Sequence, residues 1–545
     1  LPLDANTLRG SGGAKPPARR QLPEPLMPPG HHLIAGRRVP DDATAGSAAA
    51  DGPTPDLARS TPAAVELACA AAGSALAAFA ARSGTARARF LDSIAEAIEL
   101  RAAAITEIGM QETGLPAAWL AAERGDAVGQ LRRFAGHIRR GAAAGRGQDD
   151  ATRADGPSWS RPGVKLAWRP VGPVALLDAA KLPRAFSAVG GDMASALAAG
   201  CPVVVKGHPG HPGTAEILAE AVAEAARAAG IPEGVFSLIQ DGGRITGEAL
   251  VAHPLIRAVG FAGPQAEGRA LSGLCAVARR EPIPFFARPG AVNPMFLLPA
   301  ALAARAGVIA GDWAARLTQR AGQCCGRPGL AIVIDGPDAD RFVAASRAAL
   351  AEAGSQTMAS GGIAAACRQD SDRMAAGRGV RAVLAPAGGG RRVMPCLLEV
   401  AAADWLDDPL LAGEVFGPFG LIVRARHAAE MLDLARRLPE QRSCILHLDP
   451  ADTALAQSLM PVLERRAGHV LANGFSTAIA AGDGMAHGGP SPAGTNSAVT
   501  SADKLAIRRW LRPVCYQNLP ADLLPTDLLP SDLLPADPLS EDRCA

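Results

Sequence analysis

The sequence predicts an α/β protein built around a parallel β-sheet. Residues 169–177, 201–206 and 235–239 form short, continuously apolar runs, as expected of strands that are buried on both faces. An Ala-rich helical stretch separates the first two runs, and a helix is expected from about 213 to 230. This alternation is typical of dinucleotide-binding sheets, although no Gly-x-Gly-x-x-Gly fingerprint follows any of these strands.

Length and charge narrow the class of protein. With 545 residues, the chain is long enough for two or three domains. The formal net charge is only +2, and lysine occurs only at positions 15, 165, 181, 206 and 504. The predominance of Arg, beside abundant Ala, Gly and Pro, indicates a GC-rich coding bias rather than a binding signal. We therefore predict no nucleic-acid partner and no anionic membrane partner.

The ten cysteines are scattered, without Cys-x-x-Cys or Cys/His ligand spacing. We therefore expect reduced thiols, no metal site and a cytoplasmic location. The first residues lack the charged-then-apolar pattern of a signal segment. No apolar run is expected to be long enough to cross a bilayer.

Both ends of the chain are predicted to lack regular structure. Residues 1–29 are rich in Pro, Gly and Arg without periodicity, which predicts a disordered arm. Near the other end, Asp-Leu-Leu-Pro recurs at 522–525, 527–530 and 532–535, and the repeated Pro forbids a regular helix. After the arm, apolar residues at helical spacing predict two amphipathic helices from Thr61 to about Gly114.

A turn-rich stretch with paired cysteines is the strongest candidate for chemistry. Residues 322–329 read Gly-Gln-Cys-Cys-Gly-Arg-Pro-Gly and precede the apolar run 330–334. A cysteine on such a loop is accessible, and its thiolate is a strong nucleophile. Alternatively, Cys324 and Cys325 are small core residues, the commoner fate of a free cysteine, and these few residues alone favour that alternative.

A resemblance over most of the chain favours the nucleophile. Residues 322–329 resemble the nucleophile loop of aldehyde dehydrogenases, in which the second cysteine, here Cys325, would be the nucleophile. The family motif Gly-Glu-x-Phe-Gly-Pro is intact at 413–418. Further stretches resemble the 2-oxoglutarate semialdehyde dehydrogenase branch of the family, at 112–116, 473–475, 487–490 and 512–518. The likeness extends from about residue 31 to about residue 525.

The resemblance implies an aldehyde dehydrogenase-like α/β fold with a Rossmann-type cofactor domain, an α/β catalytic domain and a small β oligomerisation element. It places the cofactor domain at 30–288, with about 145–170 contributing to oligomerisation. The catalytic domain then spans 289–495. Residues 496–525 form an oligomerisation and C-terminal segment, followed by a low-complexity tail at 526–545. Family members are usually dimers or tetramers, so a homodimer or homotetramer is expected.

The resemblance also implies NADP or NAD as the cofactor. Lys206, His208 and Pro209 lie on the family's cofactor strand and the turn after it, where the Lys meets the adenosine ribose. Many NAD-preferring members have Glu at the position of Pro209. This chain is therefore expected to have no carboxylate there that would repel the 2′-phosphate of NADP.

Two other motifs complete the expected cofactor site. Residues 259–264 resemble the Phe-Thr-Gly-Ser turn beside the pyrophosphate, with Phe261 and Gly263 retained. Pro264 removes one backbone N–H from that turn. In the intact motif, Glu414 would hold the nicotinamide ribose, and Phe416 would pack beside the nicotinamide.

The expected substrate is a small aldehyde that carries a carboxylate. In the branch that this chain resembles, basic and amide side chains of one helix face that carboxylate, and Gln130 with Arg132 or Arg133 could do so here. Asp126 stands where another Arg is expected. The alternative for these charges is a solvated helix face, and the two interpretations have equal weight.

Two catalytic positions depart from the family pattern. The Asn that donates to the oxyanion is replaced by Lys181, a flexible point charge that can still donate. The Glu that activates water is replaced by Arg288, which stays protonated and cannot act as a base. Together these cations are expected to favour the Cys325 thiolate.

Three functions remain open at this point. The first is an NAD(P)-dependent oxidoreductase that oxidises 2-oxoglutarate semialdehyde to 2-oxoglutarate through a thiohemiacetal on Cys325. The second is a pseudoenzyme of the same fold with a binding or assembly role, which the replacements at 181 and 288 favour. The third, a thiol enzyme that transfers acyl groups, fits Cys325 but has no further support.

Overall fold

The computed structural model describes most of the chain between residues 31 and 528. The described residues are 31–39, 44–45, 57–58, 61–141, 147–149, 164–178, 189–240, 244–288, 290–324, 326–475, 488–489, 494, 504–525 and 528. The predicted arm at 1–29 and nearly all of the predicted tail at 526–545 therefore lie outside the described residues. So do the predicted catalytic residues Lys181 and Cys325.

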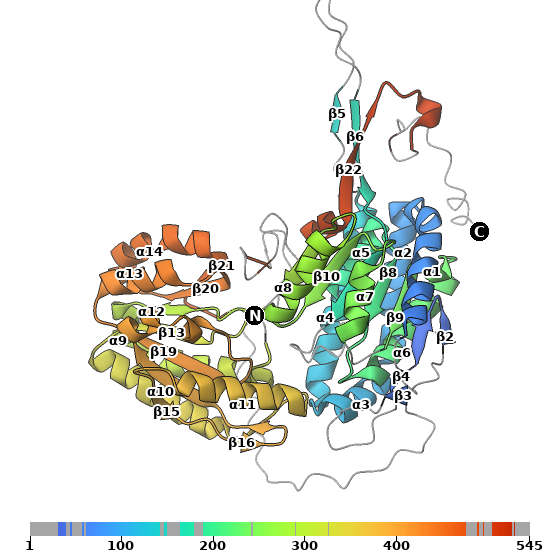
Figure 1. Ribbon diagram of the computed structural model, residues 1–545. Helices are drawn as coiled ribbons and strands as arrows, with labels where there is room; N and C mark the ends of the chain where they lie inside the picture. Colours follow the sequence, from blue (N-terminus) through green and yellow to red (C-terminus); the bar gives the residue numbers. More distant parts are fainter. Residues whose placement is uncertain are drawn as a thin grey trace, which may run out of the picture.

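The first lobe is a seven-stranded sheet covered by helices (Figure 1). Five parallel strands are continued by an antiparallel pair at one edge. In sheet order the strands are β11 (Phe285–Arg288), β10 (Ala258–Ala262), β7 (Val174–Asp178), β8 (Val203–Lys206), β9 (Phe236–Ile239), β1 (His32–Ile34) and β2 (Arg37–Val39). The helices are α1 (Pro62–Ala80), α2 (Gly84–Leu100), α3 (Ala102–Thr113), α4 (Ala117–Arg139), α5 (Gly191–Ala199), α6 (Pro212–Ala228), α7 (Arg244–Ala252) and α8 (Gln265–Gly273).

The second lobe repeats this plan with another seven-stranded sheet. Its strands are parallel except for β15 at one edge. In sheet order they are β15 (Arg381–Leu384), β18 (Cys396–Ala401), β19 (Phe419–Ala425), β13 (Leu330–Ile334), β12 (Met295–Leu297), β20 (Gln441–His447) and β21 (Ala467–Ala472). The helices are α9 (Pro299–Thr318), α10 (Pro337–Ala353), α11 (Gly361–Ala375), α12 (Ala402–Asp407), α13 (Ala428–Arg437) and α14 (Thr453–Arg466).

A three-stranded antiparallel sheet projects from the first lobe (Figure 1). It consists of β5 (Gly147–Asp149), β6 (Val164–Pro170) and β22 (Leu511–Gln517), with β6 in the middle. The 3-10 helix η10 (Lys504–Trp510) precedes β22 and packs on α5 of the first lobe. The C-terminal segment therefore returns from the second lobe to the first.

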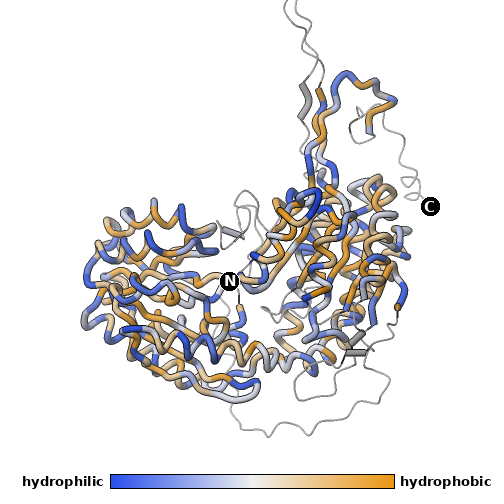
Figure 2. The backbone as a smooth tube through the Cα atoms, viewed as in Figure 1, coloured by the Kyte–Doolittle hydropathy of each residue, from blue (hydrophilic) through white to orange (hydrophobic). Residues whose placement is uncertain are grey.

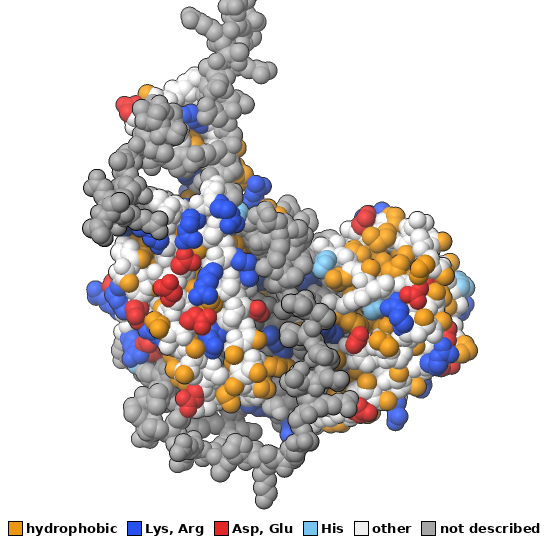
Figure 3. All heavy atoms as spheres, turned by 180° about the vertical axis from the view of Figure 1, so that it is seen from behind, with side chains coloured by type: hydrophobic (Ala, Val, Ile, Leu, Met, Phe, Trp, Pro, Cys, Tyr) orange, Lys and Arg blue, Asp and Glu red, His pale blue; other side chains and the backbone are white. Residues whose placement is uncertain are grey.

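The apolar strands form the core of each lobe, as the sequence predicts. Every residue of β9 is buried, and so are the first three of β8. Figure 2 colours the backbone trace by residue hydropathy, and apolar stretches run through the interior of the first lobe. On the face seen from behind, basic and acidic side chains are interspersed over the first lobe (Figure 3).

The structure corrects three expectations from the sequence. The run 169–177 is two strands, because the chain turns at Gly172 with a φ of 133° between β6 and β7. The stretch from Thr61 to Gly114 holds three helices rather than two, since α2 and α3 are separate. Within the described residues, α1 is the one helix long and apolar enough to cross a membrane by length and composition. Its buried side chains, such as Cys69 and Phe79, pack into the core of the first lobe.

Candidate functional site

The turn that leads to the paired cysteines has a strained backbone. After α9 ends at Thr318, the chain adopts left-handed conformations at Arg320 (φ 55°), Ala321 (φ 54°) and Gly322 (φ 71°). Arg320 and Ala321 carry a Cβ, so this conformation costs about 1–3 kcal/mol at each. Such strain persists only where the surrounding structure fixes it.

Contacts with both lobes fix this turn. The N–H of Gln323 donates to the carbonyl of Arg320 (3.0 Å), and Gln323 Oε1 accepts from the N–H of Ala359 (3.2 Å). The Arg320 guanidinium pairs with the buried Glu123 of α4 (2.7 Å) and lies over the ring of Trp119 (5.8 Å to its centroid). The turn, which belongs to the second lobe, is therefore tied to α4 of the first.

Residues near the predicted nucleophile Cys325 are held by hydrogen bonds. Cys324 is half-buried, and the N–H of Arg327 donates to its carbonyl (3.2 Å). The carbonyl of Arg327 then accepts from Asn293 Nδ2 (3.0 Å), at the start of the second lobe.

The segment that carries Glu414 and Phe416 lies against this turn. A Cβ at Gly322 would lie 2.1 Å from the carbonyl carbon and oxygen of Gly417, so only glycine permits the contact. Within the segment Val415 is buried, whereas Glu414 and Phe416 are half-buried. Val415 therefore packs in the core, whereas Glu414 and Phe416 are partly accessible.

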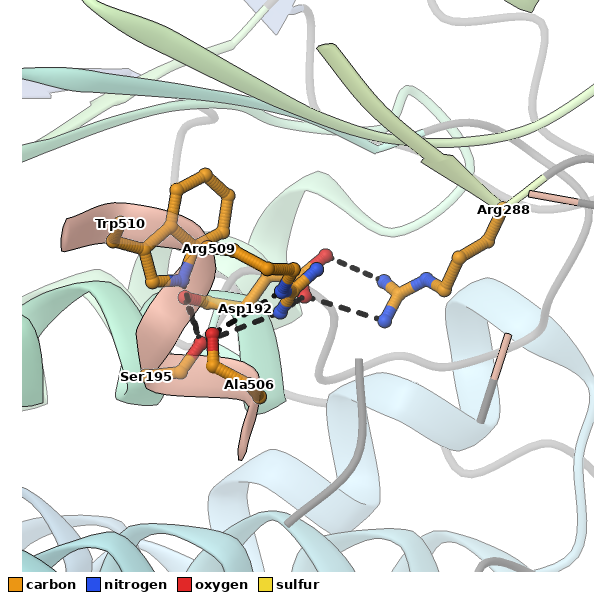
Figure 4. Close-up of polar contacts among 6 residues, drawn as sticks. All are labelled: Asp192, Ser195, Arg288, Ala506, Arg509 and Trp510. Atoms are coloured by element: carbon orange, nitrogen blue, oxygen red, sulfur yellow. Dashed lines mark hydrogen bonds and ion pairs between the residues drawn. The ribbon is translucent and has the colours of Figure 1, made fainter. Parts of the chain in front are cut away.

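Arg288 ends strand β11 and reaches Asp192 near the start of α5 (Figure 4). Its Nη2 donates to Asp192 Oδ2 (2.6 Å), and its Nη1 donates to Oδ1 (3.3 Å). Arg509 of η10 donates to the same Oδ1 (2.6 Å). Beside it, Trp510 Nε1 donates to Ser195 Oγ (2.8 Å).

This arrangement decides what Arg288 can do. Asp192 is shared by two guanidinium groups, so its carboxylate balances only one of the two positive charges. Burial lowers the pKa of Arg509, while Asp192 opposes that shift. A guanidinium stays protonated at neutral pH, so Arg288 has no lone pair with which to activate water. Both Asp192 oxygens already accept hydrogen bonds from these arginines.

The predicted cofactor residues of the first lobe lie at the carboxyl ends of parallel strands, where open α/β sheets bind ligands. Lys206 is the last residue of β8 and lies beside Leu177 of β7. Phe261 is buried and stacks on Phe285 (5.9 Å between ring centroids), so it supports the end of β10 from within the core. Gly263 is buried in the turn between β10 and α8.

One helix N-terminus at this edge is already occupied by a carboxylate of the chain. Glu112 of α3 accepts from the N–H of Gly213 (2.6 Å), the N–H of Thr214 (3.0 Å) and Thr214 Oγ1 (2.6 Å), all at the start of α6. Burial raises the pKa of Glu112 to about 7, although these three bonds oppose the shift. Helix α8, which begins after Pro264, is another helix that starts at this edge.

Two histidines follow Lys206, of which His208 is half-buried and His211 is buried. The rings of His208 and His211 are 5.2 Å apart, and His208 Nδ1 accepts from the N–H of Gly210 (3.0 Å). Burial, His211 and Lys206 lower the pKa of His208, and burial lowers the pKa of His211 to about 4. Both rings are therefore neutral at pH 7. A lysine beside neutral imidazoles, with Pro209 in place of a carboxylate, fits a phosphorylated dinucleotide.

Gln130 on α4 lies close to the ion pair between Arg288 and Asp192. A Cβ on Gly191 would lie 2.3 Å from Gln130 Oε1, so Gln130 meets α5 at the residue next to Asp192. Gln130 follows Glu123 by seven residues, about two helical turns, and therefore shares its face of α4. One face of α4 thus contacts both the cysteine turn and the start of α5 beside Asp192.

The charged residues beside Gln130 are less enclosed. Arg132 and Arg133 are exposed, and Arg133 Nη1 lies over Gly129, one turn earlier on the same helix. Asp126 is exposed as well. Both interpretations of the two arginines, as substrate ligands or as a solvated face, therefore stay predictions.

Sequence reasoning missed the residues that hold the site together. They are Glu112, Glu123, Asp192, Arg320, Arg327 and Arg509. The available signal was weak, since Asp192 and Arg509 are 317 positions apart. Glu112, at the start of a stretch already compared with the family branch, could have been found.

The protein has two α/β lobes, and the cysteine turn is bonded to both of them. The parallel sheet of the first lobe is of the dinucleotide-binding type. These features define a two-lobed α/β protein with a candidate site between its lobes. The sequence profile of the Aldehyde dehydrogenase family matches residues 47–502. The chain therefore belongs to the aldehyde dehydrogenase family, and the predicted fold class is confirmed.

Characterised relatives point to one branch of this family. The chain is 45% identical to alpha-ketoglutaric semialdehyde dehydrogenase 2 of Azospirillum brasilense, over 84% of this chain and 88% of that protein. It is 40% identical to alpha-ketoglutaric semialdehyde dehydrogenase of Acinetobacter baylyi, over 80% of this chain and 83% of that protein. The predicted resemblance to this branch is confirmed.

Solved structures share the fold at lower identity. An NADP-dependent glyceraldehyde-3-phosphate dehydrogenase from Bacillus halodurans, complexed with NADP, matches with a TM-score of 0.74 and 20% identity, over 89% of this chain and 98% of that one. Betaine aldehyde dehydrogenase from Staphylococcus aureus, in complex with NAD⁺, matches with a TM-score of 0.73 and 19% identity, over 90% of this chain and 95% of that one.

Proposed function

We propose that this protein is an NAD(P)-dependent dehydrogenase of 2-oxoglutarate semialdehyde whose turnover is limited by the replacements at 181 and 288. One observation carries the proposal. The cysteine turn is fixed between α4 and the segment of Glu414 and Phe416, in a chain 45% identical to an alpha-ketoglutaric semialdehyde dehydrogenase.

The first half of the reaction needs residues that the chain retains. The Cys325 thiolate attacks the aldehyde carbon and forms a thiohemiacetal. Lys181 donates to the oxyanion, more loosely than a positioned amide would. Glu414 would hold the nicotinamide ribose and Phe416 would pack beside the ring. A nicotinamide bound there would supply the hydride acceptor, so that oxidation of the thiohemiacetal would leave a thioester on Cys325.

The second half, hydrolysis of the thioester, lacks its usual base. Arg288 cannot take a proton from water, and it is held against Asp192. Loss of a general base costs a factor of about 10²–10⁴ in rate. This pairing also favours a second candidate, a pseudoenzyme of the same fold that binds the dinucleotide without turnover.

Specificity follows from two parts of the site. The substrate carboxylate is bound by Gln130 with Arg132 or Arg133 of α4. At the cofactor end, Lys206 and the neutral His208 face the adenosine ribose, and Pro209 offers no carboxylate to repel a 2′-phosphate. NADP and NAD are therefore both accepted, without a preference for NAD of 100-fold or more.

The surroundings of the site support an oligomeric cytoplasmic protein. The projecting sheet of β5, β6 and β22 offers the exposed backbone edge of β5 or β22 for assembly into a homodimer or homotetramer. All eight cysteines among the described residues are free thiols, as expected in a reducing compartment. Interspersed surface charges give no support to a nucleic-acid partner.

Dinucleotide reduction tests the function directly. With 2-oxoglutarate semialdehyde, the full-length protein is expected to give a burst of NADH or NADPH followed by slow turnover, because hydride transfer precedes the impaired hydrolysis. Cys325→Ala abolishes the burst, whereas the matched change Cys324→Ala preserves it. Dinucleotide binding without any burst would leave the pseudoenzyme as the function.

A further inference from the structure

We propose that Arg327 is a positioning residue for the nucleophile: it fastens the cysteine turn to the segment of Glu414 and Phe416 and places a buried positive charge next to this turn. The inference rests on the proposed role of Cys325 as the nucleophile. It concerns a residue that follows the paired cysteines and that the mechanism above does not use.

The first observation is the set of bonds that Arg327 forms. Its Nη1 donates to the carbonyl of Phe419 (2.5 Å), and its Nη2 donates to the carbonyl of Val415 (2.6 Å). The carbonyl of Val415 lies within the intact family motif, and the carbonyl of Phe419 follows the motif at the start of β19. The Arg327 side chain therefore holds the backbone of the segment that carries Glu414 and Phe416.

A second contact joins the same two segments on the other side of the paired cysteines. The backbone at Gly322 touches the peptide between Gly417 and Pro418, where no Cβ would fit. The cysteine turn is therefore attached to one segment both before and after Cys324. A shift of that segment would move both flanks of the turn together.

The third observation is the charge of Arg327. Its side chain is buried, and the bonds that the structure shows go to neutral carbonyls rather than to a carboxylate. Burial lowers the pKa of Arg327, while Glu414, Cys367 and Cys324 oppose the shift. A guanidinium nevertheless stays protonated near neutral pH. Its positive charge therefore interacts with the ionisable groups of Glu414, Cys367 and Cys324.

Glu414 is the first of the groups that oppose the lowered pKa of Arg327, so a carboxylate also shares this positive charge. The charge also reaches the thiols of Cys324 and Cys367, and a nearby cation stabilises a thiolate. Arg327 therefore acts on the thiols of this region as well as on the Glu414 segment.

Two substitutions separate positioning from charge. Arg327→Lys keeps the positive charge but loses the planar fork that bonds two carbonyls at once. Arg327→Gln loses the charge as well. Arg279→Gln is the matched control, because Arg279 also bonds backbone carbonyls, those of Val251 and His253 in the first lobe.

The experiment measures the rate of Cys325 alkylation by iodoacetamide against pH, in the full-length protein, with tandem mass spectrometry to separate Cys325 from Cys324. We expect Arg327→Gln to raise the midpoint of the pH profile by about one unit, and Arg327→Lys to keep the midpoint. Both variants should weaken NADP binding about tenfold, because the Glu414 segment is released. Arg279→Gln should change neither quantity.

Each outcome decides the proposal. An unchanged midpoint in Arg327→Gln removes the charge effect, and unchanged NADP affinity in Arg327→Lys removes the positioning effect. If Arg327→Gln fails to fold, Arg327→Lys still tests the positioning role by its NADP affinity and must keep the wild-type midpoint. Alkylation needs no turnover, so a protein without dehydrogenase activity would sink the proposed function while leaving this inference testable.

Discussion

Asp192 accepts hydrogen bonds from Arg288 and Arg509 at once, and this sharing sets the chemistry of Arg288, which stands at the proposed general-base position. A Glu at position 288 would compete with Asp192 for Arg509. Two carboxylates that share one cation raise the pKa of at least one of them. A raised carboxyl pKa brings a base closer to neutral pH, where it activates water best.

Restoring the family residues is therefore expected to restore turnover. The double variant Arg288→Glu with Lys181→Asn should raise steady-state oxidation of 2-oxoglutarate semialdehyde by about 10²-fold or more. Arg288→Glu alone should raise the rate after the burst, since it acts on thioester hydrolysis. Lys181→Asn alone should raise the burst rate, since it acts on the first chemical step. Stopped-flow measurement of NADPH formation separates the two phases.

Arg288→Gln is the control for this prediction. It removes the cation from Asp192 without adding a base, so the slow phase should stay slow. A double variant that folds and binds NADP but shows no gain would mean that the pocket differs at further positions, and the pseudoenzyme would then be the better description.

At the scale of elements, Glu112 shows how α3 and α6 are joined. Helix α6 begins with free backbone N–H groups, and Glu112 accepts from two of them and from a hydroxyl. The negative charge also suits the positive end of the helix dipole. The carboxylate therefore fixes α6, and with it the turn of His208 and His211, against the helical layer.

Removing this carboxylate should destabilise the protein. Glu112→Ala leaves the N–H groups of Gly213 and Thr214 buried without an acceptor, at a cost of about 2–4 kcal/mol. Glu107→Ala, on the exposed side of the same helix, should change stability by less than about 0.5 kcal/mol. Urea unfolding followed by circular dichroism measures both. Equal effects of the two substitutions would contradict the capping role.

For the whole molecule, buried histidines make stability depend on pH. Burial lowers the pKa of His211 and of His447 to about 4, against about 6.5 for an exposed histidine. Between these values the unfolded chain binds protons that the folded protein does not. Stability therefore falls as the pH drops from 6.5 towards 4, and each histidine contributes about 2 kcal/mol of that loss by pH 5.

His447→Phe tests this dependence without emptying the site, because His447 packs beside the ring of Phe475. The variant should lose about 2 kcal/mol less than the wild type between pH 7.5 and pH 5, as judged by urea midpoints. His469→Phe, on the neighbouring strand β21, is the matched control for replacing a histidine ring by a phenyl ring in the same sheet. An unchanged loss in His447→Phe would show that its ring is accessible to protons in the folded protein.

The sequence by itself determined the parallel sheet of the first lobe, because the continuous apolar composition of strands such as β8 and β9 already indicates that both of their faces are buried. Motif resemblance also identified the family, because the paired cysteines lie in one short motif and Glu414 and Phe416 lie in another. Local patterns do not show where a chain turns between apolar residues, as at Gly172. They also do not show that one helix ends at Leu100 and the next begins at Ala102.

Only the tertiary structure decided which charges meet. The bonds of Arg288 and Arg509 to Asp192, and of Arg320 to Glu123, join residues from 96 to 317 positions apart. Such pairs leave no periodic trace in the sequence, because ion pairing depends on distance in space and on burial. The sequence showed that position 288 holds a cation, and the fold determined that Asp192 opposes its charge.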